Sequence, residues 1–184
     1  MSNSNMSAEA LQLMLDRHQL RELALTYSRA CDRQDFPLVR SLYHDDAIDD
    51  HGEMFRGTAD EYVAWLPTIM EMWDTTTHSL TNMLFEIDGD HAQGELYVVA
   101  YHRTYPPDAQ EIVIGGRYLD KYEKRDGVWK FSYRSLALDW CNVRKVNLDD
   151  YTSFAAGAER GLHSPEDPSY LRLDLFRRGA PAPR

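Results

Sequence analysis

Apolar residues recur at helical spacing through the first part of the chain. Between Leu11 and Tyr27 they fall mostly three or four residues apart, a pattern that predicts one amphipathic helix or two consecutive helices. Ser7 is the expected N-terminal cap, because its hydroxyl can accept a backbone N–H of the first turn. A shorter helix is expected over Phe36 to Tyr43, ended by the polar residues that follow.

A third helix begins at a capping box. Thr58 and Glu61 stand three residues apart, as this motif requires, and an apolar run follows them. Pro67 lies inside that run and is expected to bend the helix or end it early. Before the capping box, a brief pair of strands is expected to turn at His51–Gly52.

From Thr75 onward the pattern changes to strands. Apolar and polar residues alternate in long segments, with Tyr97, Val99 and Tyr101 on one face. Turn residues separate the segments, including the tight-turn pair Asp126–Gly127. The expected strands are 78–87, 92–105, 112–124 and 128–139.

Helices followed by hairpin-linked strands indicate an α+β fold rather than an alternating α/β fold. A long antiparallel sheet must bury one face. Curling the sheet around the helices would achieve this and leave a concave pocket between them. Residues 1–145 are therefore expected to form one domain, and residues 146–184 a C-terminal extension with weak periodicity.

Composition narrows the functional classes. The 184 residues carry a net charge of −10, which argues against nucleic acid and anionic membranes as partners. Cys31 and Cys141 lie far apart and are expected to be free thiols. No apolar run is long enough to span a bilayer, and the polar N-terminus lacks the features of a secretory signal. We therefore expect a cytoplasmic protein.

Three polar residues are candidates for acid–base chemistry. Asp32 ends the first helical segment, His78 opens a strand, and Arg134 lies in a late strand. A carboxylate that orients an imidazole makes a general base, and an arginine can hold or polarise an oxygen. Spacing alone does not bring the three together, and residues of these types at such positions are more often structural or solvent-facing.

An acidic cluster suggests a second possibility. Oxygen and imidazole ligands in the stretch from His44 to His51 could hold a divalent ion. The stretch has no recognised ligand spacing, so a solvated, charged loop is the preferred interpretation and no metal site is predicted. The pair Gly115–Gly116 lies within a strand and is expected to mark a bend rather than a phosphate loop.

Three segments carry a resemblance to a known family. They are Tyr27-Ser28-Arg29-Ala30-Cys31-Asp32, Thr77-His78-Ser79-Leu80-Thr81-Asn82, and the stretch from Ile114 to Phe131 with Arg125-Asp126-Gly127. In these the chain resembles SnoaL-like members of the nuclear transport factor 2-like superfamily. It is most similar to the branch of scytalone dehydratase, bile acid 7α-dehydratase and hexachlorocyclohexane dehydrochlorinase, over roughly residues 15 to 142.

The resemblance implies a cone-shaped α+β barrel in which a curved antiparallel or mixed sheet wraps around N-terminal helices and encloses a cavity. It places the catalytic pair on Asp32 and His78 and the pocket arginine on Arg134. Tyr27 stands where the bile acid enzyme has tyrosine and the dehydrochlorinase has lysine, so dehalogenation is not expected. The implied substrate contacts are Tyr101, Tyr118, Val99, Ile114 and Asn82.

The implied activity is that of a cofactor-independent lyase, of the dehydratase type, acting on a small hydrophobic aromatic or steroid-like hydroxylated compound. Three alternatives stay open: release of formaldehyde from an aryl diol, isomerisation as in ketosteroid isomerases, and non-catalytic binding of a hydrophobic ligand. Isomerases of this superfamily use a carboxylate base, so His78 favours elimination. The resemblance also implies a homo-oligomer, most simply a trimer. Strands 92–105 and 112–124 carry apolar residues on both faces, so the outer face of the sheet is the expected contact.

Overall fold

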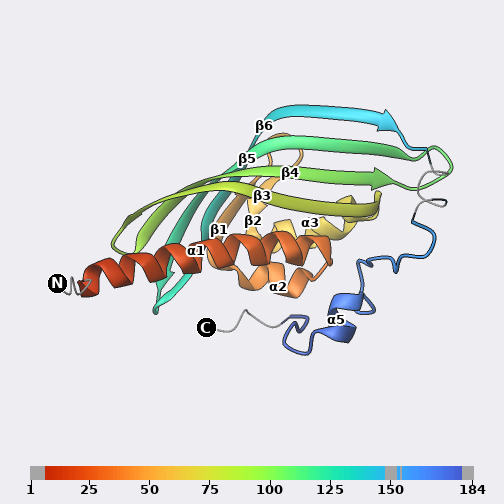
Figure 1. Ribbon diagram of the computed structural model, residues 1–184. Helices are drawn as coiled ribbons and strands as arrows, with labels where there is room; N and C mark the ends of the chain where they lie inside the picture. Colours follow the sequence, from red (N-terminus) through yellow and green to blue (C-terminus); the bar gives the residue numbers. More distant parts are fainter. Residues whose placement is uncertain (1–6, 148–152, 154, 180–184) are drawn as a thin grey trace, which may run out of the picture.

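The computed structural model describes residues 7–147, 153 and 155–179. One curved, unclosed sheet holds helices against its concave side, and the C-terminal segment runs back below them (Figure 1). No helix in the described part of the chain is long and apolar enough to cross a membrane. The helices are α1 (Ala8–Asp32), α2 (Phe36–Ser41), α3 (Ala59–Met70) and α5 (Pro168–Arg172).

The sheet has six strands in the order β2-β1-β6-β5-β4-β3. Strands β3 to β6 form an antiparallel meander, whereas β1 pairs in parallel with β6, so the sheet is mixed as expected. The strands are β1 (Tyr43–Asp50), β2 (Arg56–Thr58), β3 (Trp73–Asp88), β4 (His91–Thr104), β5 (Gln110–Arg125) and β6 (Val128–Lys145).

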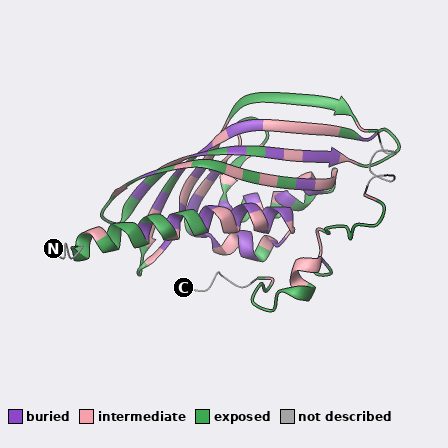
Figure 2. Cartoon of the chain, viewed as in Figure 1, coloured by how far each residue is buried: buried purple, intermediate pink, exposed green. Residues whose placement is uncertain are grey.

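Helix α1 is continuous, so the alternative of two consecutive helices is wrong. Ser7 caps it as predicted, since its side chain accepts the N–H of Ala10. The N-terminal half is largely exposed, and the C-terminal half is buried against the sheet (Figure 2). The helix ends just after Asp32, and Gln34 follows with a positive φ of 49°. The buried end of the helix therefore carries the candidate carboxylate.

The expected pair of strands around His51–Gly52 is confirmed as β1 and β2, but β1 begins at Tyr43 and so includes the acidic stretch that was expected to be a loop. Residues 43–50 form β1, which pairs with β2 and β6. Arginines neutralise its charge, because Arg40 pairs with Asp45 at 2.9 Å and Arg125 with Asp46 at 2.8 Å. Pairing on both edges and these ion pairs outweigh the low strand propensity of aspartate.

Helix α3 begins at the predicted capping box, with Thr58 and Glu61 bonded reciprocally. Pro67 does not end it early, since the helix continues to Met70. A proline removes one helical hydrogen bond, here the bond to the carbonyl of Val63. Because Pro67 lies in the last turns of the helix, little of the helix depends on that bond.

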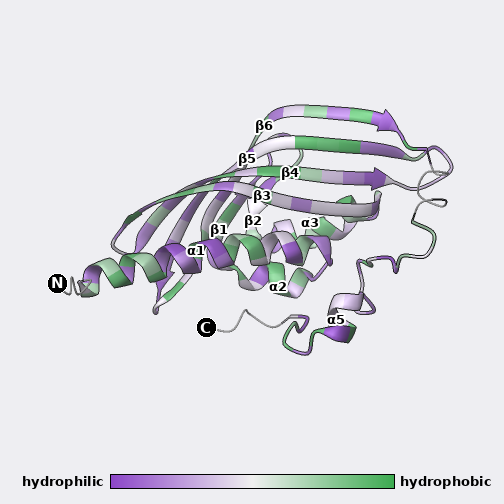
Figure 3. Ribbon diagram, in the orientation of Figure 1, coloured by the Kyte–Doolittle hydropathy of each residue, from purple (hydrophilic) through white to green (hydrophobic). Residues whose placement is uncertain are grey.

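Three strands of the meander, β3, β5 and β6, are longer than expected, and apolar and polar positions mix along the meander (Figure 3). Alternate residues of β4 are buried, so one face of the sheet packs against the helices; we call it the inner face. Its positions on β4 include Leu96, Val98, Ala100 and His102, all at most 9% exposed. Strand partners directly opposite these residues share the inner face.

Candidate active site

The structure brings Asp32 and His78 together at the end of α1. Asp32 Oδ1 lies 2.7 Å from His78 Nδ1, and Asp32 Oδ2 accepts the backbone N–H of His78 at 2.9 Å. Both side chains are nearly buried, at 8% and 12% exposure. The carboxylate therefore fixes both the ring and the backbone of His78, although 46 residues separate them in the chain.

This geometry determines the tautomer of a neutral His78. A carboxylate only accepts hydrogen bonds, so Nδ1 carries the proton and Nε2 keeps its lone pair. Within the described part of the chain, no hydrogen-bond partner of Nε2 is found. A nitrogen with a free lone pair, held in place by a carboxylate, is the arrangement that a general base needs.

A second histidine, His102, lies beside the pair and was not predicted. Its ring stands edge-on to His78 with centroids 5.5 Å apart, and its Nδ1 lies 2.9 Å from Thr76 Oγ1. Trp73 stacks on it at 4.7 Å. Burial, and then the charge of His78, lower the pKa of His102 to about 4. His102 is therefore neutral near neutral pH. The sequence signal that could have identified His102 is strand alternation, because His102 lies two residues from Ala100 and therefore faces inward with it.

Arg134 is fully buried on the inner face. Its Nε and Nη2 donate to the two oxygens of Asp120 at 2.8 and 2.7 Å. The guanidinium also lies 4.1–4.2 Å from the ring centres of Tyr27, Tyr118 and Phe131. Burial alone would lower the pKa of Arg134, but Asp120 raises it well above its ordinary value. Its Nη1 is buried with no hydrogen-bond partner among the described residues.

Tyr27 and Tyr118, two of the predicted site residues, thus both contact the Arg134 guanidinium. The hydroxyl of Tyr27 lies 2.6 Å from that of Tyr62 on α3. Burial raises the pKa of Tyr27 and Tyr118 well above that of free tyrosine, so both phenols stay protonated. Cys31, next to Asp32, is also buried, and burial raises the pKa of its thiol to about 12. A protonated thiol is a poor nucleophile.

A second Asp–His pair lies at the C-terminal end of β1. Asp49 Oδ1 lies 2.6 Å from His51 Nδ1, and Asp49 Oδ2 accepts the hydroxyl of Tyr43 at 2.7 Å. His51 stacks on Tyr62 with ring centres 5.4 Å apart. No group of side chains that could hold a metal ion is found among the described residues. The Asp49 carboxylate in the acidic stretch is thus already hydrogen-bonded to His51 and Tyr43.

The predicted substrate contacts divide between the two faces. Ile114 pairs with Ala100, which pairs with His78, so Ile114 shares their face. Val99 and Tyr101 lie on the opposite, outer face, where the Tyr101 hydroxyl donates to Glu111 at 3.0 Å. The prediction that these two line a pocket beside His78 placed them one residue out of register, because successive residues of a strand point to opposite faces.

Asn82 lies exposed on β3, where the pairing with β4 shifts between Leu80 and Met83. Beyond Ile114, the inner face is apolar and only partly covered. Leu138 pairs with Gly116 and is 62% exposed, and Val143 pairs with Ile112 and is 57% exposed. An uncovered apolar surface therefore adjoins the row that holds His78.

The outer face also carries apolar side chains. Leu84, Leu119 and Tyr133 help to line a groove of about 520 Å³ there. Trp140 lies over Gly115, where an added Cβ would come within 2.0 Å of its ring, so only glycine fits. The register of β5 and β6 shifts at Gly115–Gly116, as the expected bend implied. Assembly of a trimer through this face stays a prediction.

A profile of the SnoaL-like domain matches residues 12–135, a span that includes Asp32, His78 and Arg134. The chain belongs to the SnoaL-like family. No curated protein sequence matches it. The matched span ends within β6, so the rest of that strand and the C-terminal segment lie outside it.

Solved structures resemble this SnoaL-like protein in fold. A putative scytalone dehydratase from Novosphingobium aromaticivorans is 24% identical, with a TM-score of 0.63 over 73% of this chain and 91% of that one. A hexachlorocyclohexane dehydrochlorinase, LinA type 2, is 22% identical, with a TM-score of 0.66 over 74% and 93%. A variant of Rv3472, a Mycobacterium tuberculosis protein of unknown function, is 21% identical, with a TM-score of 0.64 over 74% and 78%. These neighbours have the nuclear transport factor 2-like cone fold.

Proposed function

We propose that this SnoaL-like protein is a cofactor-independent lyase that eliminates water from a small hydrophobic hydroxylated compound, aromatic or steroid-like. The observation that carries the proposal is the Asp32–His78 pair, in which the carboxylate leaves Nε2 of His78 free to accept a proton. Solved structures of similar fold include a putative scytalone dehydratase and a hexachlorocyclohexane dehydrochlorinase, which is consistent with a lyase.

The reaction needs one proton to move twice. His78 Nε2 takes the proton from the carbon next to an activating carbonyl or aryl group, and the electron pair forms the new double bond. The leaving hydroxide then takes the proton from the His78 imidazolium and departs as water, so the free imidazole is restored. Asp32 stabilises the imidazolium that forms between these two transfers.

The surroundings of the pair suit such a substrate. The partly exposed Leu138 and Val143, with Ile114, offer apolar contacts on the face that carries His78. Arg134 Nη1 has an unsatisfied N–H, which we assign to an activating oxygen of the substrate. His102, neutral because its pKa is lowered to about 4, adds a polar group without a competing charge.

Turnover of a panel of hydroxylated aromatics and steroids tests the proposal. We expect a new conjugated chromophore and a product lighter by one water, and we expect His78→Ala to lower turnover roughly 10²–10⁴-fold while the protein stays folded. Exchange of a substrate C–H with deuterated solvent, without loss of water, would instead indicate an isomerase. Ligand binding without turnover in wild type would indicate a binding domain and would overturn the proposal.

A further inference from the structure

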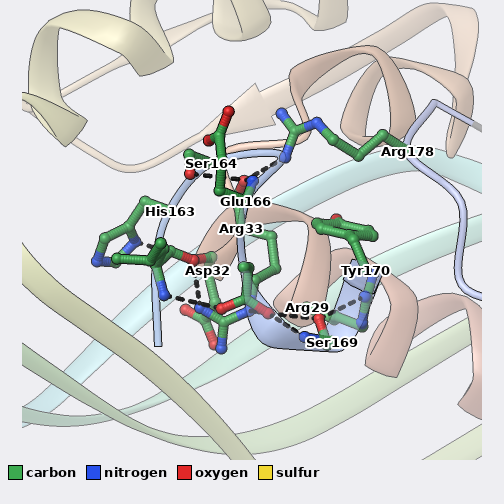
Figure 4. Close-up of polar contacts among 11 residues, drawn as sticks. Arg29, Asp32, Arg33, His163, Ser164, Glu166, Ser169, Tyr170 and Arg178 are labelled. Atoms are coloured by element: carbon green, nitrogen blue, oxygen red, sulfur yellow. Dashed lines mark hydrogen bonds and ion pairs between the residues drawn. The ribbon is translucent and has the colours of Figure 1, made fainter. Parts of the chain in front are cut away.

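The C-terminal segment returns to the end of α1 after β6. Its described residues 155–179 lie below α1 and α2 in Figure 1, and Figure 4 shows His163 beside Asp32. His163 Nδ1 lies 2.9 Å from the main-chain oxygen of Asp32, and Nε2 lies 3.3 Å from the main-chain oxygen of Asp74. One imidazole thus bridges two backbone carbonyls.

These two carbonyls belong to the elements that carry the candidate catalytic pair. Asp32 ends α1, and Asp74 lies in β3, four residues before His78. The Asp32–His78 hydrogen bond and the His163 bridge therefore link the same helix to the same strand, side by side. A change in the spacing of α1 and β3 would disturb both links together.

Other contacts hold the segment at this place. Arg178 donates to the main-chain oxygens of Arg33 and Gln34, each at 2.8 Å, and Arg29 donates to Ser169 at 3.2 Å. The Arg178 cation thus lies at the carbonyl end of α1, where positive charge is favoured by the helix dipole. The carbonyls after Asp32 thus receive donors from the C-terminal segment, which is absent from the span that matches the family.

The chemistry of the bridge is directional. Carbonyl oxygens only accept, so His163 must donate; a neutral imidazole satisfies one carbonyl and an imidazolium satisfies both. A side chain with no donor at this position would leave the main-chain oxygen of Asp32 with Arg33 Nη1, at 3.2 Å, as its side-chain donor, and would remove the link to β3.

We propose that His163 is a positioning residue for the Asp32–His78 pair, and that the C-terminal segment is a clasp that sets the spacing of α1 and β3. The inference rests on the proposed function only for its effect on turnover. The clasp acts through the main chain of Asp32, and His163 makes no hydrogen bond to His78 among the described residues.

The test compares His163→Leu, which removes the donor, with His163→Gln, which keeps an N–H donor. Arg172→Ala is the matched control, because Arg172 is exposed and pairs with Glu159 inside the same segment. Hydrogen exchange of the His78 backbone N–H, which donates to Asp32, reports the pair directly and needs no substrate. Nuclear magnetic resonance of the His78 Nδ1 proton gives a second report.

We expect His163→Leu to speed exchange of the His78 N–H at least 10-fold, to broaden the Nδ1 proton signal, and to lower kcat roughly 10-fold with little change in KM. His163→Gln should recover most of these losses, and Arg172→Ala should show none. Unchanged exchange and signal in His163→Leu would overturn the clasp, as would equal losses in both His163 variants. If His163→Leu does not fold, unchanged exchange and signal in His163→Gln support the clasp, and losses there overturn it. Failure of the proposed function would be observed separately, because the wild-type protein would then show no turnover.

Discussion

Two Asp–His pairs of nearly identical geometry lie in the part of the chain that the structure describes. Asp32–His78 and Asp49–His51 have N–O distances of 2.7 and 2.6 Å, and the histidines are 12% and 11% exposed. The first joins residues 46 apart on two elements, whereas the second joins residues two apart on and just after one strand. Pair geometry alone thus does not distinguish a candidate base from a structural contact.

The surroundings make the difference. The Asp49 carboxylate is fully buried and accepts a tyrosine hydroxyl as well as His51, whose ring is covered by Tyr62. Both oxygens of the Asp32 carboxylate are hydrogen-bonded to His78, one to its ring and one to its backbone N–H. The sheet face beside His78 carries exposed apolar side chains. We therefore assign chemistry to the first pair and stability to the second.

The largest expected effect separates the two carboxylates. Asp32→Asn should lower kcat roughly 10²–10⁴-fold, because an amide can donate to Nδ1 and so favour the wrong tautomer of His78. Asp49→Asn makes the same chemical change at the other pair and should stay within a few-fold of wild type. Steady-state turnover of both variants on the first substrate found is the measurement. Equal losses would remove the distinction between the pairs.

The next effect concerns His102, which has no counterpart at the second pair. Its folded pKa of about 4 lies below the unfolded value of 6.5, so the unfolded protein binds more protons between these pH values. The stability that depends on a neutral His102 is fully present above about pH 6.5. It is lost as the pH falls towards 4, because protonation then favours the unfolded chain, and the total loss is on the order of 3 kcal/mol. Urea unfolding across this window should show a shallower dependence on pH in His102→Gln. If the pH dependence of the unfolding free energy is the same in His102→Gln as in wild type, the lowered pKa of His102 is contradicted.

The smallest effect is on the second pair. His51→Ala should lower the free energy of unfolding by about 1–3 kcal/mol, because buried Asp49 loses a donor and Tyr62 loses a stacked ring. Turnover should remain within a few-fold of wild type. Denaturant unfolding measures the loss, with His91→Ala as an exposed histidine control. A large fall in turnover without loss of stability would make His51 a second catalytic candidate.

Local signals predicted much of the fold. Ser7, the Thr58–Glu61 box and the turn at Asp126–Gly127 act within a few residues, so the sequence displays them directly. The strand pair around His51–Gly52 was predicted, but the extension of β1 back to Tyr43 was not, because that part of the strand contacts Arg125 and pairs with β6, both far along the chain.

The candidate site was predictable only in part. The Asp32–His78 pair followed from a family resemblance, since no local pattern joins residues 46 apart. The face of Tyr101 was assigned wrongly because its strand is apolar on both faces, so alternation did not reveal which face is inward. His163 had no signal at all, because its partners are main-chain oxygens that any residue provides.

The unequal burial of the two thiols allows one of them to be labelled selectively. Cys31 is 2% exposed, and its raised pKa keeps it unreactive, whereas Cys141 is exposed. Cys141 pairs with Ile114 and so lies in the strand row that leads to His78. A maleimide dye or spin label would therefore attach to the wild-type chain at one position on the face of the candidate site, and would report ligand arrival without any engineered cysteine.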